Sequence, residues 1–135
     1  MRWSSVRGFS LIELLVVLVV IGTALTMALP KVAAIRQRML LDGAAQQVLG
    51  DLQRAQIEAI KRNRSLKVVL TGPTSYDIQF LGARELDGGV QFASAPDTVR
   101  FASFGPPASP AIYVLRLGSR EKRVELSAAG FLRVR

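Results

Sequence analysis

A single carboxylate, Glu13, lies near the start of an otherwise apolar run that reads GFSLIELLVVLVVI from Gly8 to Ile21. A charge at the centre of a bilayer-spanning helix costs roughly 2.5–3.5 kcal/mol on insertion scales. A helix that only anchors a protein gains nothing from such a charge. The position of Glu13 therefore predicts a partner for its carboxylate inside the membrane.

The chain offers few other groups for chemistry. It has no Cys and no His, which excludes disulfides, thiolate nucleophiles and Cys/His zinc sites. The sequence contains no nucleophile elbow, no P-loop and no dinucleotide-binding glycine pattern. The turn at Glu85–Gly88 offers carboxylates to a cation but does not resemble an EF-hand loop. We therefore expect no enzyme, no cofactor and no metal site.

The apolar run is long enough to cross a membrane. From Phe9 to Pro30 there are 22 residues, and only Ser10, Glu13, Thr23 and Thr26 among them are polar. As a helix this span covers about 33 Å at ~1.5 Å per residue, against a hydrocarbon core of about 30 Å.

Two ordinary interpretations of this N-terminus leave features unexplained. A cleaved secretory signal peptide uses Arg2 and Arg7 as its basic region, but its apolar region is shorter and is not interrupted by a glutamate. A plain signal anchor places the same two arginines in the cytoplasm by the positive-inside rule. It gives no role to Glu13.

A third interpretation covers every feature. MRWSSVRGFSLIELLVVLVVIG resembles the class III signal of type IV prepilins and type II secretion pseudopilins: glycine, aromatic, small polar residue, two aliphatics, glutamate, then unbroken aliphatics. The resemblance implies that prepilin peptidase cleaves after Gly8 on the cytoplasmic side and that the new N-terminal residue, Phe9, is N-methylated. Glu13 then holds the fifth position after the cut, where the family carries its glutamate. Pro30 stands where many members have a helix-kinking proline.

Cleavage also supplies the partner that the carboxylate of Glu13 needs. It creates a positively charged amine at Phe9, which in a growing filament pairs with Glu13 of a neighbouring subunit. Opposite charges that are each costly in lipid neutralise one another and attract strongly at low dielectric constant. The alternative is that Glu13 only snorkels to the headgroups, because it is four residues from Phe9.

The helical pattern continues beyond the membrane. One apolar stripe recurs at spacings of 4, 3, 4, 3 and 4 and consists of Leu41, Ala45, Val48, Leu52, Ala55 and Ala59. We expect a helix from about Ser10 to Lys61 or Arg62. A kink is expected at Pro30, because proline lacks an N–H and clashes with the preceding turn.

After Asn63 the apolar period changes from 3.6 to 2, which is typical of strands. The expected strands are Leu66–Leu70, Tyr76–Phe80, Val90–Ala93, Thr98–Phe101, Ile112–Leu117, Arg123–Leu126 and Leu132–Arg135. The pattern predicts an α+β fold, in which the second half of the long helix packs on a small antiparallel β-sheet. The expected division is a leader at 1–8, a transmembrane and filament-core helix at 9–30, its amphipathic continuation at 31–63 and a β domain at 64–135.

This layout resembles the GspH/FimT group of minor pseudopilins and minor pilins. The stretches that carry the likeness are DLQRAQIEAIKRN at 51–63, VRFASFG at 99–105 and GFLRVR at 130–135. The resemblance implies a single-pass inner-membrane protein with a cytoplasmic N-terminus and a periplasmic C-terminal domain. It further implies assembly with other pilins or pseudopilins into a type II secretion pseudopilus or a type IV pilus, in the service of protein secretion across the outer membrane.

The net charge of +8 favours acidic partners such as nucleic acid or anionic lipid. Six basic residues gather near the C-terminus: Arg116, Arg120, Lys122, Arg123, Arg133 and Arg135. Such charges ordinarily protect an edge strand from pairing. FimT-like minor pilins include subunits implicated in binding incoming DNA through a basic C-terminal region. The resemblance thus implies an alternative function, in which these six residues bind extracellular double-stranded DNA for natural transformation through salt-sensitive phosphate contacts.

Overall fold

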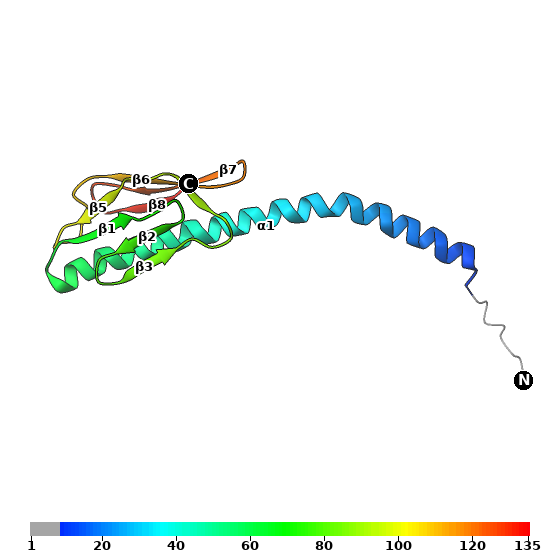
Figure 1. Ribbon diagram of the computed structural model, residues 1–135, viewed down its shortest axis with the longest axis horizontal. Coiled ribbons are helices and arrows are strands. Elements are labelled where there is room, and N and C mark those ends of the chain that lie inside the picture. Colours follow the sequence, from blue (N-terminus) through cyan, green and yellow to red (C-terminus); the bar gives the residue numbers. More distant parts are fainter. Residues whose placement is uncertain (1–8) are drawn as a thin grey trace, which may run out of the picture. The chain divides into compact units, whose positions relative to one another are not determined.

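The computed structural model describes residues 9–135, apart from the side chains of residues 27–30. Its residues form two compact units that divide between Arg36 and Gln37. The first unit contains the N-terminal part of helix α1, and the second contains the rest of α1 and all of the strands, as Figure 1 shows.

Helix α1 runs from Leu11 to Arg62 and has the extent that the sequence predicts. At its start, the carbonyl of Ser10 accepts hydrogen bonds from the backbone N–H groups of Glu13 and Leu14 at 3.0 and 3.1 Å. At its end, Asn63 adopts a left-handed conformation with φ of 48°. The helix therefore closes with a Schellman motif, which satisfies two of its last carbonyl groups. The kink expected at Pro30 falls on a residue whose side chain is not described, and it stays a prediction.

Eight strands form two antiparallel sheets in the second unit. The first sheet has the order β3-β2-β1-β5 and contains β1 (Leu66–Leu70), β2 (Ser75–Ile78), β3 (Gly82–Glu85) and β5 (Thr98–Phe101). The second has the order β4-β6-β7-β8 and contains β4 (Gln91–Ser94), β6 (Ala111–Leu117), β7 (Arg120–Leu126) and β8 (Leu132–Val134). All neighbouring strands in both sheets are antiparallel.

The α+β fold class is confirmed, while some details of the sheet differ from the expectation. The apolar pattern predicts one sheet, whereas the strands divide between two. Strand β3 was not expected, because GARE lacks the apolar alternation of a half-buried strand. Strand β2 ends at Ile78 instead of Phe80, because Phe80 has a φ of 71° and lies in a turn. Strand β7 begins at Arg120, three residues before the expected start at Arg123.

The predicted apolar stripe of α1 is the helical side of the core. All six of its residues, from Leu41 to Ala59, are no more than 4% exposed. They belong to one cluster with inward-facing residues of both sheets, among them Phe101 of β5 and Leu115 of β6. This half of α1 is therefore held by the burial of its apolar face rather than by helix propensity alone.

Candidate functional site

The N-terminal segment places apolar side chains on its outside. Between Leu11 and Ile21 the large apolar side chains are 43% to 81% exposed. The described residues contain one helix, α1, that is long and apolar enough to span a membrane. Within its apolar part, the hydroxyl of Thr23 donates to the carbonyl of Val20 at 2.9 Å, and Thr26 donates to the carbonyl of Thr23 at 2.7 Å. Both hydroxyl groups are thus satisfied within the helix, as contact with lipid requires.

Glu13 differs from these threonines. It lies in the first turn of α1, where the helix dipole favours a negative charge, and it is exposed. In the described part of the chain no basic side chain lies within ion-pair distance of its carboxylate. The next basic residue along the sequence is Lys31. A salt-bridge partner for Glu13 must therefore come from outside residues 9–135 of its own chain.

Of the two residues at the expected cleavage site, the structure describes Phe9 but not Gly8. Phe9 is 77% exposed and precedes the first residue of α1. Gly8 lies outside the described residues, as do Arg2 and Arg7. Cleavage after Gly8 and methylation of Phe9 accordingly remain predictions.

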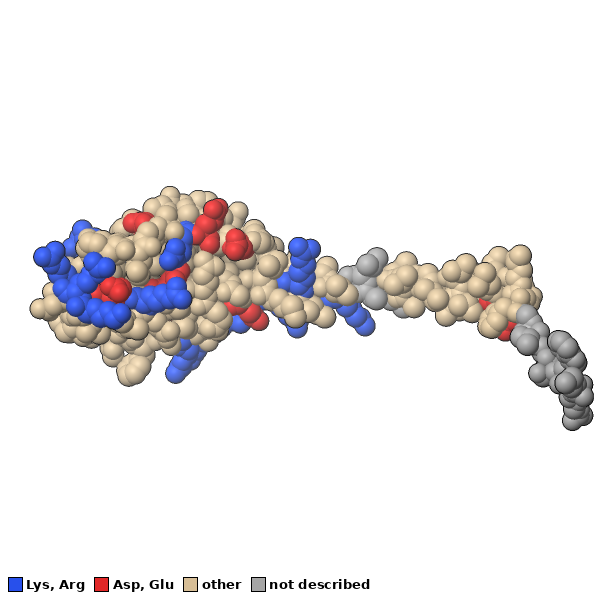
Figure 2. Space-filling model, turned by 90° about the horizontal axis from the view of Figure 1, so that it is seen from below, with Lys and Arg blue, Asp and Glu red and all other residues tan. Residues whose placement is uncertain are grey.

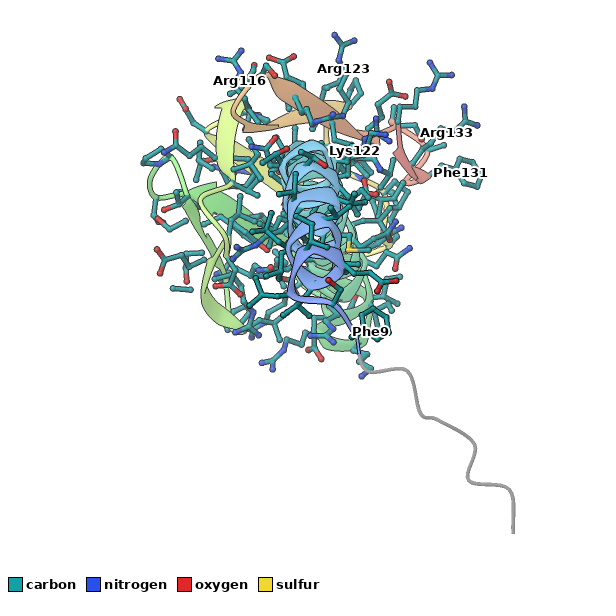
Figure 3. All side chains as sticks on the ribbon, turned by 90° about the vertical axis from the view of Figure 1, so that its right-hand side faces the viewer. Phe9, Arg116, Lys122, Arg123, Phe131 and Arg133 are labelled. Carbon is teal, nitrogen blue, oxygen red and sulfur yellow. The ribbon has the colours of Figure 1, made fainter. Side chains whose placement is uncertain are left out.

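The second sheet separates the six basic residues that the sequence analysis singled out. Alternation along the strands puts Arg123 on the opposite side of β7 from Val124 and Leu126, which are buried. Register then places Arg123 opposite Val114 and, through two 2.8 Å backbone hydrogen bonds, opposite Arg135. We call this side the outer face of the sheet. Its basic side chains are Arg116, Arg123 and Arg133, which Figure 3 labels, together with Arg135.

Two of these four arginines are neutralised within the face. Arg116 pairs with Glu121 at 2.5 Å, and Arg135 lies 3.9 Å from Glu125. For Arg123 and Arg133, no acidic side chain comes within 4 Å among residues 9–135. The outer face thus keeps two arginines free to contact an anion.

The remaining two basic residues, Arg120 and Lys122, lie on the other side of β7, toward α1. Lys122 forms an ion pair with Asp42 of α1. Figure 3 shows Lys122 on the opposite side of the strand from Arg116 and Arg123. The sequence analysis grouped all six residues, so it missed both this separation and the part that α1 takes in it. The signal was available, because strand period 2 sets residues 120 and 122 apart from residues 121 and 123.

Arg120 and Lys122 line an open hollow of about 510 Å³. Its charged walls comprise Arg38, Asp42, Arg120, Glu121, Lys122 and Arg135. The sequence analysis did not single out Arg38. It lies one helical turn before Asp42, a spacing that puts the two residues on neighbouring positions of the helix surface.

A buried polar cluster joins α1 to the first sheet. Asp51 is 6% exposed and accepts a 2.7 Å hydrogen bond from the hydroxyl of Tyr76. Arg84 and Arg54 each lie 3.8 Å from its carboxylate. Burial, followed by the hydrogen bond to Asp51, raises the pKa of Tyr76 above its usual value. The cluster is closed and satisfied, which suits a structural role.

The carboxylates elsewhere are dispersed. Among residues 9–135, including the turn at Glu85–Gly88, no three acidic side chains lie close enough together to hold a metal ion.

The exposed apolar helix, the buried stripe that follows it and the two antiparallel sheets define a pilin-type subunit with a membrane anchor. Models of known families agree. The prokaryotic N-terminal methylation motif matches residues 3–29, and the type II transport protein GspH matches residues 44–130. The chain belongs to the GspH family.

Comparisons with individual proteins are consistent with this family. The chain is 40% identical over 72 residues to the pilin-like protein PilA1 of Thermus thermophilus, a match that spans 52% of this chain and 45% of that relative. The chain thus matches less than half of the relative's length. Two crystal structures of the type IV minor pilin FimU of Pseudomonas aeruginosa share the fold. They have TM-scores of 0.61 and 0.55 at 16% and 19% identity, and the matches span 75% and 70% of this chain and 92% of FimU.

Proposed function

We propose that this chain is a minor pseudopilin or pilin that is processed at its N-terminus and then assembles through Glu13. Membership of the family implies assembly with other pilins, and the methylation motif together with the apolar helix indicates membrane anchoring. Prepilin peptidase cuts after Gly8, Phe9 becomes the methylated N-terminus, and the subunit waits in the inner membrane with its folded part in the periplasm.

The observation that carries the proposal is the isolation of Glu13. Two threonines of the same apolar stretch bond to their own helix, whereas Glu13 has no basic side chain within reach among the described residues. A carboxylate that enters lipid without a partner is expensive. The amine of a neighbouring, cleaved Phe9 removes that cost and fixes the axial register between two helices. We take this pair as the link that draws the subunit into a pseudopilus for protein secretion, or into a type IV pilus.

Under this proposal, each segment of the chain has a separate role. Residues 1–8 are a removable leader, and residues 9–30 are the membrane anchor and later the filament core. Residues 31–63 continue the helix and provide its buried stripe. Residues 64–135 form the folded surface that neighbours in the filament contact.

The test is the state of the N-terminus in a cell that supplies prepilin peptidase and partner pilins. The expected mature protein begins with N-methylated Phe9, as read by intact mass and by the N-terminal peptide. Gly8→Val should retain the leader and fail to enter the sheared filament fraction. The matched control is Gly22→Val, where a Cβ meets no atom within 4 Å, and it should be processed normally. A wild-type chain that keeps its leader in this setting would refute the proposal.

A second function has one observation in its favour, the outer face of the second sheet. Arg123 and Arg135 lie directly opposite each other across β7 and β8, although like charges at such positions are destabilising. Arg123 and Arg133, the two arginines of this face without an acidic partner among residues 9–135, form a basic surface that suits the phosphates of double-stranded DNA, as FimT-like capture of extracellular DNA requires.

A gel shift with the full chain in a nonionic detergent separates this function from a purely structural role. DNA binding predicts a complex at low salt that weakens steeply as salt rises. Arg123→Gln combined with Arg133→Gln should abolish most of the shift. Lys61→Gln combined with Arg64→Gln removes the same charge from the far end of α1 and should leave the complex largely intact. The absence of a complex at low salt would eliminate this function.

A further inference from the structure

The hollow between α1 and β7 is a second concentration of basic groups, which adjoins the outer face and shares Arg135 with it. It holds four basic side chains and two acidic ones in a volume of about 510 Å³. Both acids are already paired, because Asp42 binds Lys122 and Glu121 binds Arg116. Elsewhere Lys and Arg side chains also gather where α1 ends (Figure 2), but there Arg62 is paired with Glu58.

Two arginines of the hollow remain without an acidic partner. No Asp or Glu side chain in residues 9–135 lies within 4 Å of Arg38 or Arg120. One comes from the helix and the other from the first residue of β7, and both line the same space. A guanidinium group presents a rigid fork of N–H donors that matches the oxygens of a phosphate. The hollow therefore offers two such forks to one phosphate-bearing ligand.

The position of Arg38 in the sequence indicates which kind of phosphate-bearing ligand the hollow meets. The turn between β6 and β7 approaches α1 at Gln37, since a Cβ built on Gly118 would lie 4.0 Å from Nε2 of Gln37. In the sequence, Arg38 follows Pro30, the end of the apolar run, by only eight residues, so the chain keeps Arg38 near the membrane surface. The headgroup layer extends roughly 5–8 Å beyond the hydrocarbon core. Long arginine side chains snorkel over the remaining distance.

The walls of the hollow favour a lipid headgroup over nucleic acid. They include no aromatic ring on which a base could stack. The hollow is local, with a volume of about 510 Å³, which suits a single phosphate group rather than the extended phosphate backbone of DNA. Lys31 and Arg36, both exposed, lie in the sequence between the apolar run and Arg38 and add to the attraction for an anionic surface.

We propose that Arg38 and Arg120 bind the phosphate of an anionic phospholipid headgroup while the subunit waits in the membrane before assembly. This inference rests on the membrane anchoring in the proposed function and adds a ligand to it. Release of the headgroup then becomes part of extracting the subunit into a filament.

The test uses the full chain in a maltoside detergent and follows the side-chain Nε–H NMR signals of Arg38 and Arg120. Short-chain phosphatidylglycerol should shift both signals in a saturable way, and short-chain phosphatidylcholine should not. Arg38→Gln combined with Arg120→Gln should weaken the response, read on the backbone amide of Lys122, by at least tenfold. Arg123→Gln combined with Arg133→Gln removes equal charge from the outer face and should leave the response unchanged.

Three outcomes would overturn the inference. One is an equal affinity for inorganic phosphate, which would make the hollow a site for free phosphate. Another is displacement of the lipid by a short DNA duplex, and the last is an equal loss of lipid response in both double variants. Arg38→Gln alone, on the exposed helix surface, repeats the test without touching β7. The titration needs neither peptidase nor filaments, so its failure would leave the proposed processing and assembly standing.

Discussion

The two halves of α1 present opposite surfaces. In the first, from Leu11 to Ile21, large apolar side chains cover every side and are 43% to 81% exposed. In the second, the six residues of the apolar stripe from Leu41 to Ala59 are no more than 4% exposed, whereas Ile57, which lies off that stripe, is 52% exposed. A helix that is apolar on every side is stabilised by contact with lipid or with copies of itself, whereas an amphipathic helix buries its apolar face against its own chain. One continuous element thus serves two environments.

One carboxylate in each half of α1, Asp51 and Glu13, shows the same difference between the halves. Asp51, in the folded half, is surrounded by Tyr76, Arg84 and Arg54. Glu13, in the apolar half, has no such partner in the described chain. A buried charge is tolerated only when it is paired. Asp51 thus has its partners within the subunit, whereas we propose that Glu13 gains its partner on assembly.

The largest predicted effect comes from one substitution made in each half. Leu52→Ala should lower the free energy of unfolding by about 2–5 kcal/mol, because Leu52 is 2% exposed and leaves a cavity. Leu15→Ala should leave that free energy unchanged, because Leu15 is 51% exposed. Chemical denaturation in detergent, followed by near-ultraviolet circular dichroism, measures both. Equal destabilisation by the two variants would contradict the division of α1.

High pH should weaken the folded half alone. The chain has two tyrosines, and burial raises the pKa of both Tyr76 and Tyr113 above the usual value near 10. The unfolded chain therefore releases these protons first, and stability is full below about pH 10 and falls above it. The slope should approach ~2.7 kcal/mol per pH unit for two groups. Tyrosinate absorbance should rise together with unfolding; a separate rise near pH 10 in the folded protein would oppose this prediction.

Removal of the hydroxyl of Tyr76 should have an intermediate effect. Tyr76→Phe deletes the 2.7 Å hydrogen bond to Asp51 and leaves a buried carboxylate with two arginines at 3.8 Å. The expected loss is about 1.5–3 kcal/mol of stability, as for a hydrogen bond to a charged group. The control is Tyr113→Phe, for which the structure records no hydroxyl contact with a charged residue, and it should cost less. Thermal unfolding of both variants decides the order.

The smallest effect is expected at the end of α1. The hydrogen bond from Arg62, at 2.9 Å, lowers the pKa of Glu58 below its usual value. Arg62→Gln should return that pKa toward the ordinary range with little change in overall stability, because the pair is solvent-exposed. A side-chain NMR titration of Glu58 measures the shift. A large loss of stability in this variant would show that the end of α1 matters more than its exposure indicates.

Much of this architecture was predictable because it follows local periodicity. The spacing of Leu41, Ala45 and Val48 located the buried face, and the change of period after Asn63 located the strands. The division into two sheets depends on pairing between distant strands, such as β1 with β5, which no local pattern encodes. Strand β3 escaped detection because it lies at a sheet edge and its side chains are mostly exposed.

The candidate sites also differ in how far they could be predicted from the sequence. Glu13 was visible from the sequence because one charge in an apolar run is a local anomaly. The hollow was not visible, because Arg38 and Arg120 are 82 residues apart and meet only through the packing of β7 on α1. The separation of Arg120 and Lys122 from Arg123 was not predicted, because the expected strand began only at Arg123, and the structure shows that Lys122 faces the helix.

The central claim is that Glu13 is completed by a neighbouring subunit, and incorporation of Glu13→Leu into filaments tests it most directly. The measurement compares the sheared filament fraction with the membrane fraction, in cells that supply peptidase and partner pilins. The account predicts normal membrane insertion and cleavage but little or no incorporation. Thr23→Leu, which removes a polar group already bonded within the helix, should assemble normally. Normal incorporation of the Glu13→Leu subunit would contradict the account.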